Sequence, residues 1–275
     1  MTTRPFRFAA VTRPQGDGAS WQATARQIED LGYSTLLMPE GVHWLSTVPS
    51  LAVAATAAPT LRVGSFVLAA PLRTPRSAAW DAHTMSVLTD GRFDFGIGIG
   101  RPSMKDESAV LGMPYGSAAE RLEQVAQAIR DLRELDGDRR TPVMMAISGA
   151  PKSRALAAAE ADAIHLAVSP LMPEKELAEV VAGIRDAAGD RADQIDVATN
   201  VYSVNSELMP EMSAFLGVDA AMLAEHNSVS YLAGEPAEMA DELERRREAT
   251  GISYFTVHVG AYVNFAPVIE LLRRR

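Results

Sequence analysis

Glu40 and His43 follow a short apolar segment, Thr35–Met38, and their side chains could carry acid–base chemistry. A carboxylate and an imidazole at the end of a strand can accept and return a proton during a reaction. The same residue types, with Trp44 beside them, are also typical of a surface loop that packs one aromatic residue. The spacing alone leaves both interpretations open.

Three alternating glycines, Gly96, Gly98 and Gly100, lead to Arg101. Their G-x-G-x-G spacing differs from the dinucleotide-binding fingerprint, and a Pro-Ser pair follows where a helix would have to open. Glycines at a strand end let a planar or anionic ligand approach the backbone. They can equally leave room for neighbouring core side chains, so the pattern predicts either a ligand contact or close packing.

Ser148, Gly149 and Ala150 join a predicted strand to a helix that begins at Pro151. Small residues at a helix N-terminus leave backbone N–H groups free at the positive end of the helix dipole, which favours a phosphate. A plain strand-to-helix turn has the same composition. The segment is therefore a candidate anion site with a structural alternative.

Several chemistries are excluded by missing residues. The chain has no Cys, which excludes disulfides, thiolate metal sites and a Cys nucleophile. No Lys follows a Gly, and no Gly-x-Ser-x-Gly motif occurs. The histidines lack the paired helical spacing of zinc peptidases, and we expect no metal. His165 and His258 end two predicted strands, where a hydrogen-bonded structural role is the commoner one.

Composition and charge argue against nucleic-acid and membrane partners. The formal net charge is −9, and dense basic clusters occur only at Arg245–Arg247 and Arg273–Arg275. No apolar run approaches the roughly 18 residues that span a bilayer. Met1–Pro14 lacks the apolar stretch of a secretory signal. We therefore expect a cytoplasmic protein whose partner is a small-molecule substrate.

Short apolar segments alternate with amphipathic segments along the whole chain. Strands are expected to begin near residues 6, 35, 62, 93, 143, 162, 196 and 254, each followed by a helix. Eight such units without a linker favour a single (β/α)8 TIM barrel over residues 1–275, rather than a doubly wound sheet. The loops after the strands of such a barrel form its catalytic face, where the candidate residues would meet.

Local signals set the expected boundaries of these elements. Ser20 is expected to cap the first helix, and Ser117 with Glu120 matches a capping box. The third strand is expected over Arg62–Ala69, and residues 100–116 are expected to form a polar loop. Two short helices are expected within Met209–His226 and could form a lid.

Through several motifs in the same order, the chain resembles the bacterial luciferase-like superfamily, specifically its flavin- or deazaflavin (F420)-dependent oxidoreductases. The most specific segment is Asp90–Gly100, with the sequence DGRFDFGIGIG. Arg26–Tyr33, Leu61–Leu68, Ser148–Lys152 and Gly234–Ala240 match in the same order, so the resemblance covers nearly the whole chain.

The resemblance implies a (β/α)8 barrel with the ring of F420 or FMN across its mouth. A bulge in the third strand, often with a non-prolyl cis peptide bond, would back the ring near Phe66 and Val67. The phosphate would lie on the turn that starts at Ser148. The implied cofactor contacts are Phe66, Val67, Gly98, Gly100, Ser148, Gly149 and Ala150.

This sequence departs from the family pattern at three places. The family commonly has Asp-His after its second strand, where this chain has Glu40 and Gly41. Some F420-dependent dehydrogenases carry a catalytic Glu where Arg101 stands, which argues against a sugar dehydrogenase. The insertion that usually precedes the fifth strand is shortened to Asp136–Thr141.

The leading hypothesis is an F420-dependent oxidoreductase that transfers a hydride between the deazaflavin and a small organic substrate. His43, Glu40 and Arg101 are the expected polar groups at the reacting centre, and the resemblance implies a homodimer. F420 is favoured over FMN because 23 Arg against three Lys indicate an actinobacterial-type host. The alternatives are an FMN-dependent luciferase-like monooxygenase and a degenerate, non-catalytic flavin-binding barrel.

Overall fold

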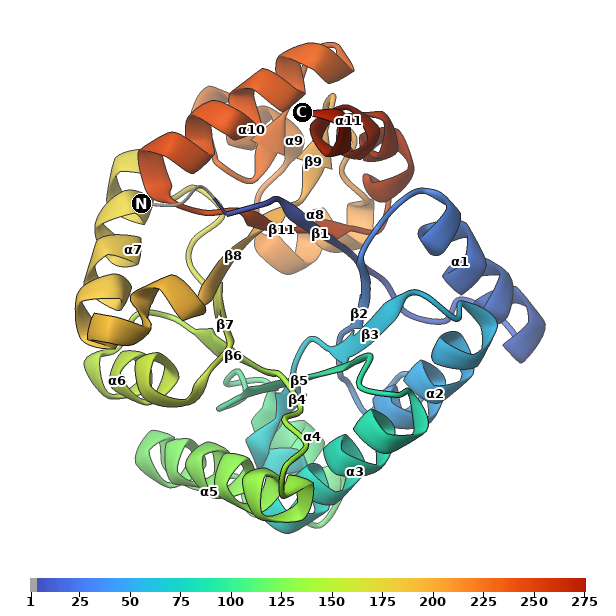
Figure 1. Cartoon of the computed structure of the whole chain (residues 1–275), viewed down its shortest axis with the longest axis vertical. Coiled ribbons are helices and arrows are strands. Elements are labelled where there is room, and N and C mark those ends of the chain that lie inside the picture. The colour runs from blue at the N-terminus through green and yellow to red at the C-terminus, as the bar shows by residue number, and fades with distance from the viewer. Residues whose placement is uncertain (1–3) are drawn as a thin grey trace.

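The computed structural model describes residues 4–275, which form a closed barrel of parallel strands surrounded by helices (Figure 1). The strands pair in the order β3-β2-β1-β11-β8-β7-β6-β5, and a pairing between β3 and β5 closes the ring. The predicted (β/α)8 TIM barrel is confirmed. The barrel strands are β1 (Arg7–Val11), β2 (Thr35–Met38), β3 (Arg62–Ser65), β5 (Phe93–Gly98), β6 (Val143–Ile147), β7 (Ala163–Leu166), β8 (Asp196–Val201) and β11 (Tyr254–His258).

A long helix follows each barrel strand and packs its apolar side on the barrel. In the first of them, Trp21, Ala25 and Ile28 are buried at helical spacing. No helix within residues 4–275 has the length and apolarity needed to cross a membrane. The long helices are α1 (Gly18–Asp30), α2 (Thr47–Ala57), α3 (Pro75–Leu88), α5 (Ala118–Asp136), α6 (Pro151–Glu160), α7 (Glu174–Ala188), α10 (Pro236–Thr250) and α11 (Tyr262–Arg274).

Local capping explains where two of these helices begin. Ser117 and Glu120 form the predicted capping box of α5, each side chain accepting from the other's backbone N–H. The predicted cap at Ser20 is wrong. Asp17 caps α1 instead, because its carboxylate accepts from the Ser20 backbone N–H at 2.9 Å and places a negative charge at the helix N-terminus.

The third strand is interrupted in the middle of the expected range Arg62–Ala69. β3 ends at Ser65, a cis peptide bond joins Phe66 to Val67, and β4 (Leu68–Ala69) resumes the pairing with β5. The Ser65 hydroxyl replaces the strand pairing at this point. It accepts from the Gly96 backbone N–H at 2.9 Å and donates to the Gly96 carbonyl at 2.8 Å.

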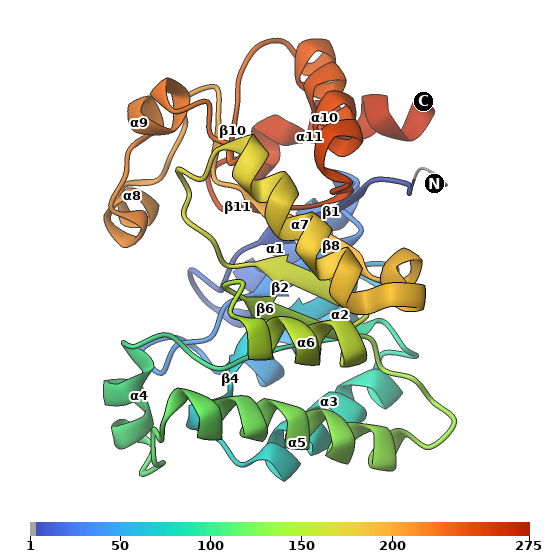
Figure 2. The same cartoon turned by 90° about the vertical axis from the view of Figure 1, so that its left-hand side faces the viewer.

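Short elements cover the C-terminal end of the barrel, at the left in Figure 2. The expected polar loop 100–116 contains a helix, α4 (Met104–Val110), because Met104 packs against Ala69 and Leu72. The two short helices expected after β8 are confirmed as α8 and α9. The remaining short elements at this end are η1 (Ala70–Leu72), β9 (Ser203–Val204), α8 (Pro210–Leu216), α9 (Ala220–Glu225) and β10 (Tyr231–Leu232). At the opposite end of the barrel, η2 (Gly189–Gln194) leads into β8.

The barrel interior is filled, and its N-terminal end is closed by ion pairs. Apolar side chains such as Val11, Leu37 and Met144 pack together in the barrel interior. At the N-terminal end Arg7 pairs with Asp94 and Asp196 beside a cavity of about 320 Å³. In barrels of this kind chemistry occurs at the opposite, C-terminal end.

Candidate active site

A cluster of buried polar side chains lies inside the barrel near its C-terminal end. His165, Asn200 and His258 come from β7, β8 and β11, which are adjacent strands. Asn200 Oδ1 lies 3.2 Å from His165 Nε2 and 2.7 Å from His258 Nε2. Thr256 Oγ1 donates to the same oxygen at 2.9 Å. Every second residue of a strand points inward, so three neighbouring strands bring these groups together.

Burial keeps both imidazoles uncharged at neutral pH. Desolvation lowers the pKa of His165 to about 4, with the hydrogen bond to Asn200 acting in the opposite direction. Desolvation, together with the nearby His165, lowers the pKa of His258 to about 3. The cluster is therefore polar without carrying a charge.

Two aromatic side chains flank this cluster. The ring of Phe66 meets His165 edge-on, with 4.6 Å between ring centroids. Tyr202, which follows β8, lies against His258 with the same centroid separation. Burial raises the pKa of the Tyr202 phenol, and the positive charge of Arg101 opposes this shift. The phenol is consequently a neutral group at the edge of the mouth.

The glycines of β5 make room for the interrupted third strand. A Cβ added to Gly96 would lie 1.8 Å from the Ser65 carbonyl oxygen. One added to Gly98 would lie 3.0 Å from a methyl carbon of Val67. Of the two interpretations of this run, the structure favours close packing at these two positions. Gly100 follows the strand with φ +76°, a conformation that favours glycine.

Arg101 lies at the exposed rim of the mouth. Its guanidinium carbon is 4.7 Å from the centroid of the Phe215 ring, a cation–π contact. Phe215 belongs to α8, so this contact joins the segment after β5 to the segment after β8. The short helices after β8 thus reach over the mouth, in the position expected of a lid.

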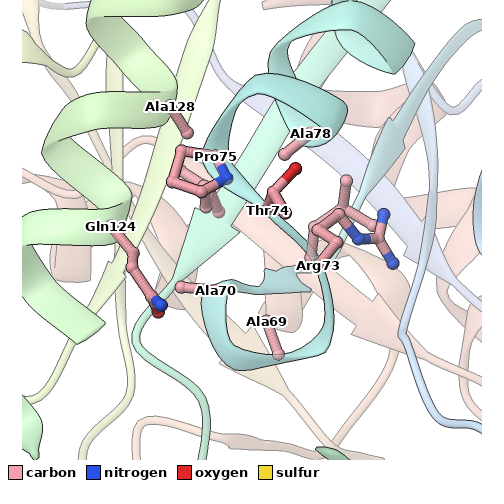
Figure 3. Close-up of a pocket in the computed structure, with 10 residues that line it drawn as sticks. Ala69, Ala70, Arg73, Thr74, Pro75, Ala78, Gln124 and Ala128 are labelled. Carbon is pink, nitrogen blue, oxygen red and sulfur yellow. The ribbon is translucent and has the colours of Figure 1, made fainter. Parts of the chain in front are cut away.

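The side chain of Glu40 is 8% exposed, and both oxygens of its carboxylate have partners. One oxygen accepts from the Ala69 backbone N–H at 2.7 Å, and the other pairs with Arg73. Burial raises the pKa of Glu40, and Arg73 opposes that shift. The hollow in Figure 3 lies beside Arg73, between η1, α3 and α5, and is too narrow to admit a water molecule. The geometry of Glu40 therefore fits a positioning role, and its assignment to the reacting centre stays a prediction.

The loop after β2 is held by α4. The backbone N–H of Val42 donates to the Glu107 carboxylate at 2.8 Å. Next to it His43 is exposed, and the guanidinium of Arg13 stacks on Trp44 at 4.8 Å. His43 thus lies on an anchored loop with its imidazole in solvent, and a catalytic role for it also stays a prediction.

The turn between β6 and α6 has the features of an anion site. Gly149 has φ +93°, and Ser148 and Ala150 are exposed. Ala150 occupies the N-cap of the ten-residue helix without a side-chain cap. The first-turn N–H groups of α6 are therefore not used by a capping side chain, an arrangement that suits a phosphate.

The structure brings the expected site residues together only in part. Val67 meets Gly98 at the bulge and Phe66 packs on His165. Arg101 lies at the rim, whereas Glu40 faces η1 and His43 faces solvent. Sequence reasoning missed Asn200 and Tyr202. The alternation of Ala198 and Asn200 in β8, continued by Tyr202 just after it, was the available signal, because it indicates a shared inward face.

A sequence model of the family described as luciferase-like monooxygenase matches residues 2–207. The chain belongs to this family. No curated protein matches it. The luciferase-like barrel also has distant relatives among solved structures. One is the coenzyme F420-dependent tetrahydromethanopterin reductase of Methanopyrus kandleri, with 16% identity, 98% and 97% of the two chains covered, and a TM-score of 0.73.

Two further structures share the luciferase-like fold. An F420-dependent secondary alcohol dehydrogenase, in complex with an F420–acetone adduct, has 18% identity and a TM-score of 0.72, with 97% of each chain covered. A long-chain alkane monooxygenase has 13% identity and a TM-score of 0.75, covering 100% of this chain and 92% of the other. At these identities the likeness shows the fold alone.

Proposed function

We propose that this protein is an F420-dependent oxidoreductase that acts on a small organic substrate. The observation that carries the proposal is the interruption of the third strand at Phe66 and Val67, for which the glycines of β5 leave room at the mouth. In this account the bulge backs the cofactor ring. When bound, the deazaflavin supplies a carbon that accepts or donates a hydride, and the protein supplies orientation and a dry site.

The residues at the mouth fit such a cofactor. Ser148, Gly149 and Ala150 would hold its phosphate, because the uncapped start of α6 faces that turn. Gly98 leaves room for Val67 of the bulge, and Gly100 would let the cofactor approach the backbone closely. Arg101 would bind a polar group at the rim, and the lid helix that contacts it would exclude water. His43 is the proposed proton acceptor, and Glu40 fixes its loop to the start of β4.

An FMN-dependent monooxygenase is the second candidate, and the description of the matching family supports it. The purified protein is titrated with F420 and with FMN, and quenching of tryptophan fluorescence measures the binding of each cofactor. This measurement separates the two candidates. We expect micromolar binding of F420 and weaker binding of FMN. Tight FMN binding without F420 binding would support the second candidate, and binding of neither would leave a non-catalytic barrel.

A variant pair ties this binding to the proposed phosphate turn. Ser148→Asp adds a negative charge where the phosphate would lie, and Ser148→Asn is nearly the same size without the charge. We expect Ser148→Asp to weaken cofactor binding at least about tenfold, the effect of about 1.4 kcal/mol. Ser148→Asn should bind like the unaltered protein. Equal binding by both variants would remove the turn from the proposed site.

A homodimer is proposed on a different surface. Trp80, Val87 and Leu88 lie on one exposed face of α3, and these residues are 67%, 42% and 72% exposed. Such a stripe is typical of a surface that a second copy covers. Sedimentation of the protein and of Trp80→Glu/Leu88→Glu tests this, with a dimer expected for the first and a monomer for the second.

A further inference from the structure

Asn200 determines which nitrogen of each neighbouring imidazole carries a hydrogen. His165 Nε2, His258 Nε2 and Thr256 Oγ1 all lie within 3.2 Å of Asn200 Oδ1. A carboxamide oxygen only accepts hydrogen bonds, so each Nε2 must be a donor. A carboxamide NH2 in the same place could give its two hydrogens to the imidazoles while the Thr256 hydroxyl donates to the Thr199 carbonyl at 3.2 Å. The 2.9 Å contact between Asn200 and Thr256 Oγ1 would then have no hydrogen, which favours the oxygen.

The other ring nitrogen of each imidazole is then an acceptor. In a neutral imidazole with hydrogen on Nε2, Nδ1 carries a lone pair. Within residues 4–275, neither His165 Nδ1 nor His258 Nδ1 has a hydrogen-bond partner, whereas each Nε2 has one. The cluster therefore uses its donors internally and leaves two acceptors for a ligand.

We propose that His165 and His258 form an uncharged acceptor pair on the floor of the mouth. This pair selects a substrate group that is neutral and carries a hydrogen to donate, such as a hydroxyl or an N–H. The inference rests on the proposed function, because it takes the mouth to be the substrate site. A carboxylate has no hydrogen to donate, so its lone pairs would repel those of both Nδ1 atoms.

The surroundings of the pair agree with a neutral ligand group. Phe66 packs against one imidazole and Tyr202 against the other, so the adjoining walls are aromatic. The nearby cation, the guanidinium of Arg101, stacks on the Phe215 ring at the rim of the mouth. An anion on the floor would lose its hydration without gaining a partner there.

The first test needs no cofactor. Long-range hydrogen–nitrogen NMR of protein labelled with ¹⁵N-histidine reports which ring nitrogen is protonated, and His165→Gln and His258→Gln assign the signals. We expect both rings to be neutral with hydrogen on Nε2 from about pH 8 to about pH 5, below the ordinary histidine pKa of about 6.5. Hydrogen on Nδ1 in either ring, or titration near pH 6.5, would overturn the inference.

The second test uses the protein with bound cofactor and three probes of similar shape: cyclohexanol, cyclohexanone and cyclohexanecarboxylate. Cyclohexanol should move the Nδ1 signals, and the ketone and the carboxylate should not. Movement with all three probes, or with none, would contradict the inference. Failure of the cofactor to bind would contradict the proposed function instead, and the first test would still decide the inference.

Asn200→Asp supplies a matched variant. A carboxylate beside an imidazole raises the imidazole pKa by about one to three units, so this variant should protonate at least one ring at mildly acidic pH. At pH 5 its preference for cyclohexanol over cyclohexanecarboxylate should then fall at least about tenfold. An unchanged preference in a variant whose NMR shows an imidazolium would contradict the proposed selection.

Discussion

The carboxylate of Glu40, in the loop after β2, lies 2.7 Å from the backbone nitrogen of Ala69, which belongs to β4. The same carboxylate pairs with Arg73, and its side chain is 8% exposed. This arrangement ties the loop after β2 to the segment that resumes pairing beyond the cis bond. These two contacts within the fold explain why a carboxylate occupies position 40.

Glu40→Ala should lower the free energy of unfolding by about 3 kcal/mol, because it leaves Arg73 and the Ala69 N–H without their partner. Urea denaturation measures this. Glu123→Ala is the control, since the pair of Glu123 with Arg130 is exposed and should contribute less than about 1 kcal/mol. Full stability with lost turnover in Glu40→Ala would instead support a place for Glu40 at the reacting centre.

Stability should fall between pH 6.5 and pH 5. The pKa values of His165 and His258 are lowered to about 4 and about 3 in the folded protein, so the unfolded chain binds more protons in this interval. The free energy of unfolding therefore decreases as the pH falls, by about 3 kcal/mol for the two residues together.

Urea denaturation at the two pH values tests the pH effect, with His165→Gln/His258→Gln as the comparison. The double variant should lose about 3 kcal/mol less than the unaltered protein over this interval. Carboxylates with lowered pKa, such as Glu242, lose their stabilising charge only at more acidic pH. Equal slopes in the two proteins would show that the imidazoles are not held neutral by the fold.

Gly96→Ala should destabilise the barrel by about 3 kcal/mol or more, because its Cβ would lie 1.8 Å from the Ser65 carbonyl oxygen. Gly98→Ala should cost about 1 kcal/mol, since the neighbouring Val67 methyl group can move. Gly18→Ala is the control, with no atom within 4 Å of the added Cβ, and should stay within about 0.5 kcal/mol. Thermal unfolding of the three variants should give this order, and a stable Gly96→Ala protein would contradict the described bulge.

Ala150→Asp should separate stability from cofactor binding. An aspartate at this N-cap would bond the free N–H groups of α6 and raise stability by about 1 kcal/mol. The same carboxylate would repel the cofactor phosphate, so binding should weaken at least about tenfold. Ala150→Gly, which adds no charge, should retain binding. Tighter cofactor binding by Ala150→Asp would contradict the phosphate site at α6.

Features that depend on local sequence were predictable. The capping box of Ser117 and Glu120 and the helix Pro75–Leu88 follow from residues within a few positions of one another. Asp17 was missed as a cap because Ser20 has the same preference, and only the backbone geometry separates them. The helix α4 was missed because burial of Met104 against η1 is a tertiary contact.

The site was less predictable, because its contacts join distant parts of the chain. The partners of Glu40 lie 29 and 33 residues away. The cluster around Asn200 needs three strands in register, and its neighbours are 35 and 58 residues away. The bulge at Phe66 and Val67 was expected only through the family resemblance, since nothing in the local residue types requires it.

A crystal structure of the protein with F420 tests the central claim most directly. We expect the deazaflavin ring to lie against the peptide that joins Phe66 to Val67, with the phosphate at the turn formed by Ser148, Gly149 and Ala150. A ring bound elsewhere, such as in the cavity beside Arg7 at the opposite end of the barrel, would contradict it. So would a structure in which saturating F420 leaves the mouth without cofactor.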